Sequence, residues 1–174
     1  MPIYALGDIT PQIDATAYVH PDAVVIGKVT IGAESTIWPG AVLRGDGAGI
    51  VIGARTSIQD GAIVHNTEVL PTTIGDDCTV GHLAHLEGCT VQNAVLIGTA
   101  SIILHEALVE TGALVGANAV VTNRLRVPAG AMALGVPAKI REGAASLEQN
   151  LHDAAHYVQR GQRYRLEQRR LDRR

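Results

Sequence analysis

Three short segments of the sequence place imidazole and carboxylate side chains close together. They read RGD at residues 44–46, QDGAIVH at 59–65 and HLAHLE at 82–87. Imidazole and carboxylate groups are good zinc ligands, and carboxylates also orient ligating histidines. A zinc ion held in this way lowers the pKa of its bound water to about 7. The residue types therefore indicate metal-assisted chemistry of water on a small molecule.

The elements that must position these groups follow from a repeat of six residues. An aliphatic residue recurs at every sixth position in several unbroken runs, and the residue two positions before it is usually small. Alternation within a strand turns both kinds of residue toward the same, inward face. The sequence has no Phe and 19 glycines, which fits a narrow interior with sharp corners. The aliphatic runs are Ile13, Val19, Val25, Ile31, Ile37, Leu43; Ile52, Ile58, Val64; Ile74, Val80, Leu86; and Val91, Ile97, Ile103, Val109, Val115, Val121, Val127.

This repeat predicts an all-β solenoid. Six residues make a short strand and a turn, and three such units, about 18 residues, close one triangular coil. Neighbouring coils pair their backbone groups at a spacing of about 4.8 Å. The unit resembles the hexapeptide repeat of left-handed parallel β-helices, and the handedness rests on that resemblance. We expect this domain to span residues 1–140.

Two longer spacings interrupt the repeat. Nine residues separate Leu43 from Ile52, and ten separate Val64 from Ile74. The extra residues lie in RGDGAGIV and HNTEVLPTT, and we expect both segments to bulge as loops. Loops on a rigid scaffold often carry function.

A helix is expected after the repeat ends. Residues 141–174 are predicted to pack on the coil and to end in a basic tail. Ser146 and Gln149 can form a capping box, and helical spacing of apolar residues follows over about 146–172. Gly161 could bend or break this helix.

Composition excludes several classes of function. The net charge is −3, made of −6 over residues 1–140 (6 basic, 12 acidic) and +3 over 141–174 (8 basic, 5 acidic). The basic end has no accompanying nucleic-acid motif, so no nucleic-acid partner is expected. No apolar run reaches the roughly 18 residues of a membrane span, and the first residues do not resemble a signal peptide. Two cysteines make no disulfide framework, and we expect a cytoplasmic protein.

The repeat also predicts which polar residues meet. If the insertions preserve the three-sided phase, Leu43, Val64 and Leu86 occupy one side of successive rungs, and the residue after each faces outward. Asp60 and His82 stack at a corner in the same way. Since that corner is remote from His65, a metal site using both histidines would be shared between copies in a symmetric oligomer. The region gathers Arg44, Asp46, Gln59, Asp60, His65, His82, His85 and Glu87.

Longer motifs carry a family resemblance. AYVHPDAVVIGKVTIG, IWPGAVLRGD, IGARTSIQDGAIVH, VGH followed by GC, and GVPAKIR are similar to the gamma-class carbonic anhydrase family over residues 10–142. The resemblance implies a homotrimer with zinc, or iron, between subunits. It places the first two metal ligands on His65 and His82. The third family ligand is a histidine, and its position here is Glu87, with His85 two residues earlier. Glu87, His85 or a weak or absent metal site all remain open.

Other family roles carry over by the same resemblance. Arg44 and Asp46 match a pair used across the trimer interface, and Gln59 and Asp60 match residues beside the metal-bound water. Glu68 stands where some members place a proton-transfer glutamate. The long acidic loop of those members is absent, and a tyrosine common in relatives is Ala133 here.

The resulting hypothesis is hydration of carbon dioxide to bicarbonate by a Zn²⁺ enzyme, with Fe²⁺ or Co²⁺ as other possible metals. An anionic glutamate in place of a neutral histidine makes the metal a weaker Lewis acid, so low or conditional activity is expected. One alternative is a hexapeptide acyl-coenzyme A transferase. The other is a non-catalytic trimeric scaffold that retains a relic metal site.

Several candidate residues have simpler interpretations. Cys78 and Cys89 occupy small inward positions and are expected to pack in the core. His105 lies one rung above Glu87, where it can approach the site or form a surface corner. His152 and His156 are one helical turn apart and are expected on the helix surface, although such a pair can bind metal.

Overall fold

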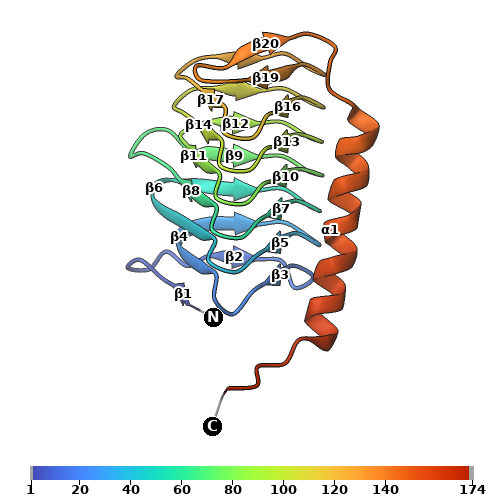
Figure 1. The fold of residues 1–174 in the computed structure, drawn as a ribbon. Helices are drawn as coiled ribbons and strands as arrows, with labels where there is room; N and C mark the ends of the chain where they lie inside the picture. The colour runs from blue at the N-terminus through green and yellow to red at the C-terminus, as the bar shows by residue number, and fades with distance from the viewer. Residues whose placement is uncertain (1, 173–174) are drawn as a thin grey trace.

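Most six-residue units form a strand of two or three residues and then a turn, because the inward aliphatic side chain alternates with outward neighbours. In the computed structural model, which describes residues 2–172, these units build a left-handed parallel β-helix of about seven turns with one long helix at its side (Figure 1). The predicted fold class is therefore confirmed.

Residues 2–172 form two sheets, of 12 and 8 strands, in which neighbouring strands are parallel except for the antiparallel pair β19–β20. The first sheet contains β17 (Val120–Val121), β14 (Ile102–Ile103), β11 (His85–Glu87), β8 (Ile63–His65), β6 (Val42–Ile52), β9 (Thr72–Ile74), β12 (Thr90–Val91), β15 (Leu108–Val109), β18 (Arg126–Val127), β4 (Val24–Ile31), β1 (Ile3–Tyr4) and β2 (Gln12–Ile13). The second contains β20 (Lys139–Arg141), β19 (Met132–Leu134), β16 (Leu114–Val115), β13 (Leu96–Ile97), β10 (Thr79–Val80), β7 (Ser57–Ile58), β5 (Thr36–Ile37) and β3 (Tyr18–Val19).

The core is a column of aliphatic side chains with small residues between them. Ile37, Ile58 and Ile97 are completely buried, as are Leu43 and Leu86. The two cysteines lie in this core as expected. Burial raises the pKa of each thiol to about 12. Both thiols are therefore neutral packing groups near pH 7.

The first insertion is not a loop, and that prediction was wrong. Residues 44–51 continue β6, whose backbone pairs with β4 on one side and with β8 and β9 on the other. Gly45 and Gly27 are needed because these strands approach closely. An added Cβ would lie 2.4 Å from the Lys28 carbonyl oxygen at Gly45 and 2.5 Å from the Gly45 carbonyl oxygen at Gly27. The glycines thus permit strand contact here.

The second insertion is a loop, as predicted. Residues 66–71 leave the ladder between β8 and β9. The Thr67 amide donates to the Leu70 carbonyl oxygen at 3.1 Å, and the Thr67 hydroxyl accepts from the Leu70 amide at 2.9 Å. These bonds close the loop without disturbing the phase of the next rung.

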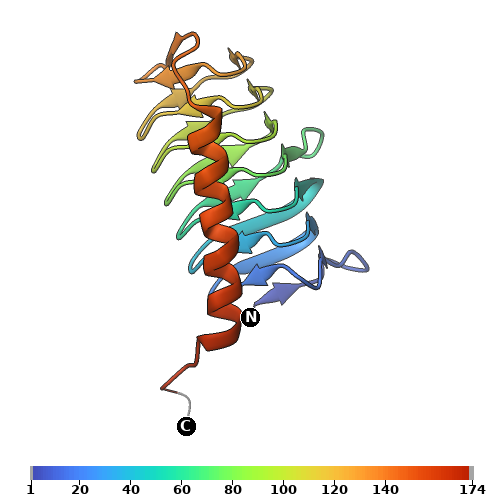
Figure 2. The same ribbon diagram turned by 90° about the vertical axis from the view of Figure 1, so that its right-hand side faces the viewer.

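Helix α1 (Leu147–Glu167) runs along the second sheet and contacts β3, β5, β7 and β10 (Figure 2). Ser146 accepts a hydrogen bond from the Gln149 amide, while the Gln149 side chain donates to Asp153. Only half of the predicted capping box is therefore formed. The Asn150 amide group anchors the helix by donating to the carbonyl oxygens of Ala94 at 3.0 Å and Ala113 at 3.1 Å.

The helix is not broken at Gly161, and it ends at Glu167 rather than near residue 172. Gly161 is buried, and an added Cβ would lie 2.4 Å from Thr36 Cγ2. The glycine therefore allows close contact between helix and sheet. No helix within residues 2–172 has the length and apolar composition needed to cross a membrane.

Candidate functional site

The predicted register is present. Leu43, Val64 and Leu86 lie side by side on β6, β8 and β11. The residues that follow them, Arg44, His65 and Glu87, are likewise paired across the strands. These three residues lie in a line on the outer surface, and we call them the polar column.

His65 is held between two carboxylates. Its Nδ1 lies 3.0 Å from Glu87 Oε1, and its Nε2 lies 2.9 Å from Asp46 Oδ1. Asp46 also forms an ion pair with Arg44. The His65 side chain is only 17% exposed. Both imidazole nitrogens are therefore engaged, and the ring orientation is fixed by carboxylates from the two neighbouring strands, β6 and β11.

The two carboxyl groups around His65 have lowered pKa values. Burial raises the pKa of Asp46, but the hydrogen bonds with His65 and Arg44 and the Arg44 charge outweigh burial, so the pKa falls below its ordinary value. Burial acts in the same direction on the pKa of Glu87. There the hydrogen bond and charge of His65, with further contributions from His85 and His105, lower the pKa overall. Both groups are therefore carboxylates at neutral pH.

Glu87 is surrounded by three imidazoles. Besides His65, His85 Nε2 lies 3.3 Å from Glu87 Oε2 and His105 Nε2 lies 3.7 Å from Glu87 Oε1. His105 therefore approaches Glu87 and belongs to the site region. The sequence left open whether it would approach the site or form a surface corner. The signal was the 18-residue spacing from Glu87 to His105, one full turn of the coil.

Asp60 and His82 form a second pair on a different side. They follow β7 and β10 of the second sheet, and His82 Nδ1 lies 2.9 Å from Asp60 Oδ2. Both side chains are about half exposed, at 48% for His82 and 49% for Asp60. Gln59 lies beside this pair but is only 4% exposed. The carboxylate on Nδ1 leaves Nε2 of His82 to bind a ligand.

One chain therefore carries two separate clusters of imidazole and carboxylate groups, which we call half-sites: His65 with Asp46 and Glu87, and His82 with Asp60. Within residues 2–172, no three His, Cys, Asp or Glu side chains are arranged to hold a metal ion. Glu68 does not join either half-site: it is exposed in the loop 66–71 and makes no hydrogen bond or ion pair with another residue of the described chain. His65 is the last residue of β8 in the first sheet, whereas His82 follows β10 in the second sheet.

The donor chemistry nevertheless fits a divalent metal. Two imidazoles and one carboxylate are a known ligand set for catalytic zinc. A carboxylate hydrogen-bonded to one ring nitrogen of a histidine orients the other nitrogen toward a metal, and Asp60 occupies this position at Nδ1 of His82. His65 would have to exchange one of its two carboxylate partners for the metal.

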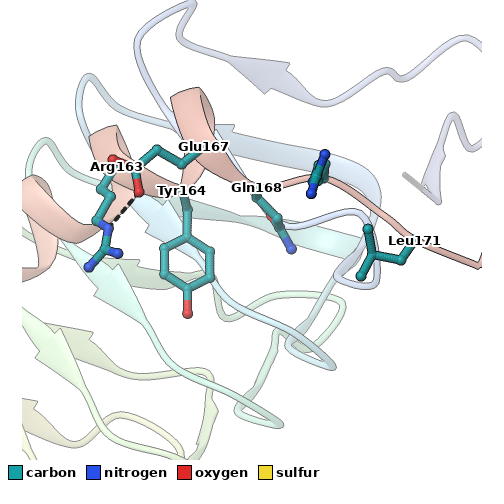
Figure 3. Close-up of a pocket in the computed structure, with 6 residues that line it drawn as sticks. Arg163, Tyr164, Glu167, Gln168 and Leu171 are labelled. Carbon is teal, nitrogen blue, oxygen red and sulfur yellow. Dashed lines mark hydrogen bonds and ion pairs between the residues drawn. The ribbon is translucent and has the colours of Figure 1, made fainter.

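Cavities border the long helix at several places. One, of about 390 Å³ near the end of α1, is lined by Arg163, Tyr164, Gln168 and neighbours, with an Arg163–Glu167 ion pair beside it (Figure 3). It includes none of the residues predicted for the site. A second cavity, of about 370 Å³, lies between α1 and the second sheet and includes Gln59 and His82.

Residues 10–45 match the family "Bacterial transferase hexapeptide (six repeats)". Over 138 residues, 76% of the chain, it is 44% identical to "Gamma carbonic anhydrase 2, mitochondrial" of Arabidopsis thaliana, of whose length it spans only 50%.

Two further relatives are covered more completely. "Protein YrdA" of Escherichia coli (strain K12) is 42% identical over 139 residues, which are 76% of each protein. A hexapeptide transferase family protein from Anaplasma phagocytophilum has a solved structure with a TM-score of 0.90 and 32% identity, covering 94% of this chain and 98% of that one. The similarity therefore extends over coil and helix together.

Proposed function

Because this chain belongs to the gamma carbonic anhydrase-like family of hexapeptide-repeat proteins, we propose that it is a metal-dependent enzyme that hydrates carbon dioxide to bicarbonate. The observation that carries the proposal is the pairing of His65 with Glu87 on neighbouring rungs, at 3.0 Å. The second half-site supplies His82, held by Asp60. Together the two halves offer two imidazoles and a carboxylate to one ion.

The two half-sites meet if the protein is a homotrimer in which each copy contributes His82 to its neighbour. Exposed apolar side chains beside both half-sites support such contact. Ile63 pairs with His85 and is 37% exposed, and Leu83, between His82 and His85 in sequence, is 65% exposed. A cyclic trimer would repeat one contact three times and bury both residues.

Glu87 is the better candidate than His85 for the third ligand. The register places Glu87 opposite His65 on the polar column, whereas His85 lies opposite Ile63 and Ile102. Two residues along a strand are about 6.5 Å apart, so their side chains leave the sheet at different places. His85 at 3.3 Å from Glu87 is placed to orient that carboxylate.

The surrounding residues have positioning roles in this proposal. Asp60 orients His82, and Arg44 fixes Asp46, which in turn holds His65. Asp60 and Gln59 would orient the reacting water or carbon dioxide. Bound Zn²⁺, or Fe²⁺ or Co²⁺, would supply hydroxide at neutral pH. Glu68 or a nearby group would pass the released proton outward.

Stopped-flow hydration of carbon dioxide by metal-loaded protein tests the proposal. We expect a rate above that of buffer, lower than for a site with three histidines, because anionic Glu87 reduces the positive charge of the centre. His65→Ala should lose this rate. Equal rates for wild type and His65→Ala would overturn the proposed function.

Two other functions are distinguished by simple measurements. An acyl-coenzyme A transferase would show a thermal shift with coenzyme A. This alternative is tested because the relative from Anaplasma phagocytophilum is described as a hexapeptide transferase family protein. A non-catalytic scaffold would form the trimer but take up no zinc, iron or cobalt under any loading condition. We also propose a cytoplasmic location, since both cysteines are buried and unpaired, as is usual in a reducing compartment.

A further inference from the structure

The cavity between α1 and the second sheet joins one half-site to the surface of the helix. Its volume is about 370 Å³. Apolar and backbone groups of β10 and β13 form part of its wall on the coil. Asp153, His156 and Tyr157 form its wall on the helix. The polar side chains that line it are Gln59, Thr79, His82, Thr99, Asp153, His156 and Tyr157.

Two of these side chains have polar groups without a protein partner. Thr79 is 5% exposed, and its hydroxyl oxygen is buried with no hydrogen bond to any described residue. Gln59 is 4% exposed, and its side-chain amide makes no hydrogen bond within residues 2–172. A buried hydroxyl without a partner is costly, and water is its usual partner. The cavity far exceeds the roughly 30 Å³ that one water occupies in the liquid.

The cavity connects two histidines in different settings. His82 belongs to the half-site with Asp60, whereas His156 is exposed on α1. The ionisable groups around His156 are Asp153 and Tyr157 on the helix, His152 one turn earlier, Arg160 over the Tyr157 ring at 5.7 Å, and His82 across the cavity. An exposed imidazole can accept a proton from water on one side and give it to buffer on the other.

We propose that water in this cavity carries protons between the His82 half-site and His156, and that His156 exchanges them with solvent. The inference rests on the proposed function. Hydration converts CO₂ and H₂O into HCO₃⁻ and H⁺; neutral His156 takes up that proton through the cavity water and releases it to a buffer base. The exposed Glu68, in the loop 66–71, is the competing route.

Oxygen-18 exchange between carbon dioxide and water, with metal-loaded protein at chemical equilibrium and low buffer, separates two rates. One is the interconversion of carbon dioxide and bicarbonate, and the other is the proton-dependent release of labelled water. In His156→Ala we expect unchanged interconversion and a loss of water release on the order of 100-fold, the lower end for a positioned acid or base. Added imidazole should restore the release.

His152→Ala is the matched control, since His152 is an exposed histidine one turn earlier that does not line the cavity. It should leave both rates unchanged. If His156→Ala releases labelled water as fast as wild type, or if Glu68→Gln alone slows release, the inference falls while the proposed function stands. If wild type shows no interconversion, the proposed function itself fails.

A readout independent of activity is the water content of the cavity. In a high-resolution crystal structure of the metal-free protein, we expect ordered water bonded to the Thr79 hydroxyl and continuing to the His156 imidazole. A dry cavity, or one closed between Thr79 and His156, would overturn the inference.

Discussion

At the residue scale, position 87 sets the charge of the proposed metal site. Three imidazole rings lie near the Glu87 carboxylate. Their nitrogens are 3.0 Å (His65), 3.3 Å (His85) and 3.7 Å (His105) from its oxygens. A carboxylate there serves as a common partner for these rings. It also makes the ligand set one charge more negative than three neutral histidines would be.

Glu87→His is predicted to raise carbon dioxide hydration by metal-loaded protein. A neutral third ligand leaves more positive charge on the metal, and we expect about a tenfold gain, equal to about 1.4 kcal/mol of transition-state stabilisation. Stopped-flow assays and metal analysis check it. His85→Ala should bind metal almost normally. Loss of metal in His85→Ala with retention in Glu87→Ala would assign the third ligand to His85 instead.

The lowered pKa values of Asp46 and Glu87 predict a pH dependence of stability. A carboxyl whose pKa is lower in the folded than in the unfolded state stabilises the fold above its unfolded pKa. That stabilisation is lost as pH falls below the ordinary values of 3.8 for Asp46 and 4.5 for Glu87 and through the lower folded values. Urea unfolding of metal-free protein between neutral and acid pH measures this. Wild type should lose stability more steeply than Asp46→Asn or Glu87→Gln, and identical slopes would contradict the prediction.

At the scale of elements, the sequence repeat predicted the core and the polar column because a six-residue period leaves little freedom in which side chains face inward. Leu43, Val64 and Leu86 are paired as that period requires. The repeat did not reveal that 44–51 is a strand. The nine-residue spacing from Leu43 to Ile52 suggested a loop, whereas the segment continues the strand and Gly45 allows a close approach to Lys28 on β4.

The position of α1 could not be derived in the same way. A helical period shows which residues share a face, but not which rung each residue meets. His156 was therefore expected merely on the helix surface, and its place in a cavity with Thr79 and His82 emerged only from the fold. The contact of Gly161 with Thr36 could not be predicted from the sequence either, because the helical period does not show which rung Gly161 meets.

Gly161→Ala is predicted to destabilise the protein by about 1 kcal/mol, because crowding against Thr36 outweighs the gain of about 1 kcal/mol in helix propensity. Thr36→Ser removes Cγ2 while keeping the hydroxyl that accepts from Trp38. In that background, Gly161→Ala should become stabilising. Urea unfolding of the four proteins tests this change of sign. A stabilising effect in both backgrounds would show that the glycine is not a packing requirement.

At the scale of the whole molecule, the chain presents two incomplete half-sites and exposed apolar side chains beside them. Leu83 is 65% exposed next to His82, and Ile63 is 37% exposed on the strand of His65. A symmetric trimer accounts for both features with one repeated contact.

If the proposed trimer forms, Leu83→Glu is predicted to dissociate it and to abolish metal uptake, because a charge would be buried at each contact. Val69→Glu is the matched control, since Val69 is 79% exposed in the loop 66–71. Sedimentation velocity gives the masses. A trimer that persists in Leu83→Glu with full metal content would place the interface elsewhere.

The most direct test of the proposal that the catalytic site is shared between subunits is subunit complementation. His65→Ala and His82→Ala subunits are mixed in equal amounts, reassembled and loaded with zinc, and carbon dioxide hydration is measured. Each variant alone should be inactive, since every site lacks one histidine. In random trimers about a quarter of the sites combine intact halves, so the mixture should recover about a quarter of wild-type activity. A mixture of verified mixed trimers that stays inactive beside active wild type would contradict a site shared between copies.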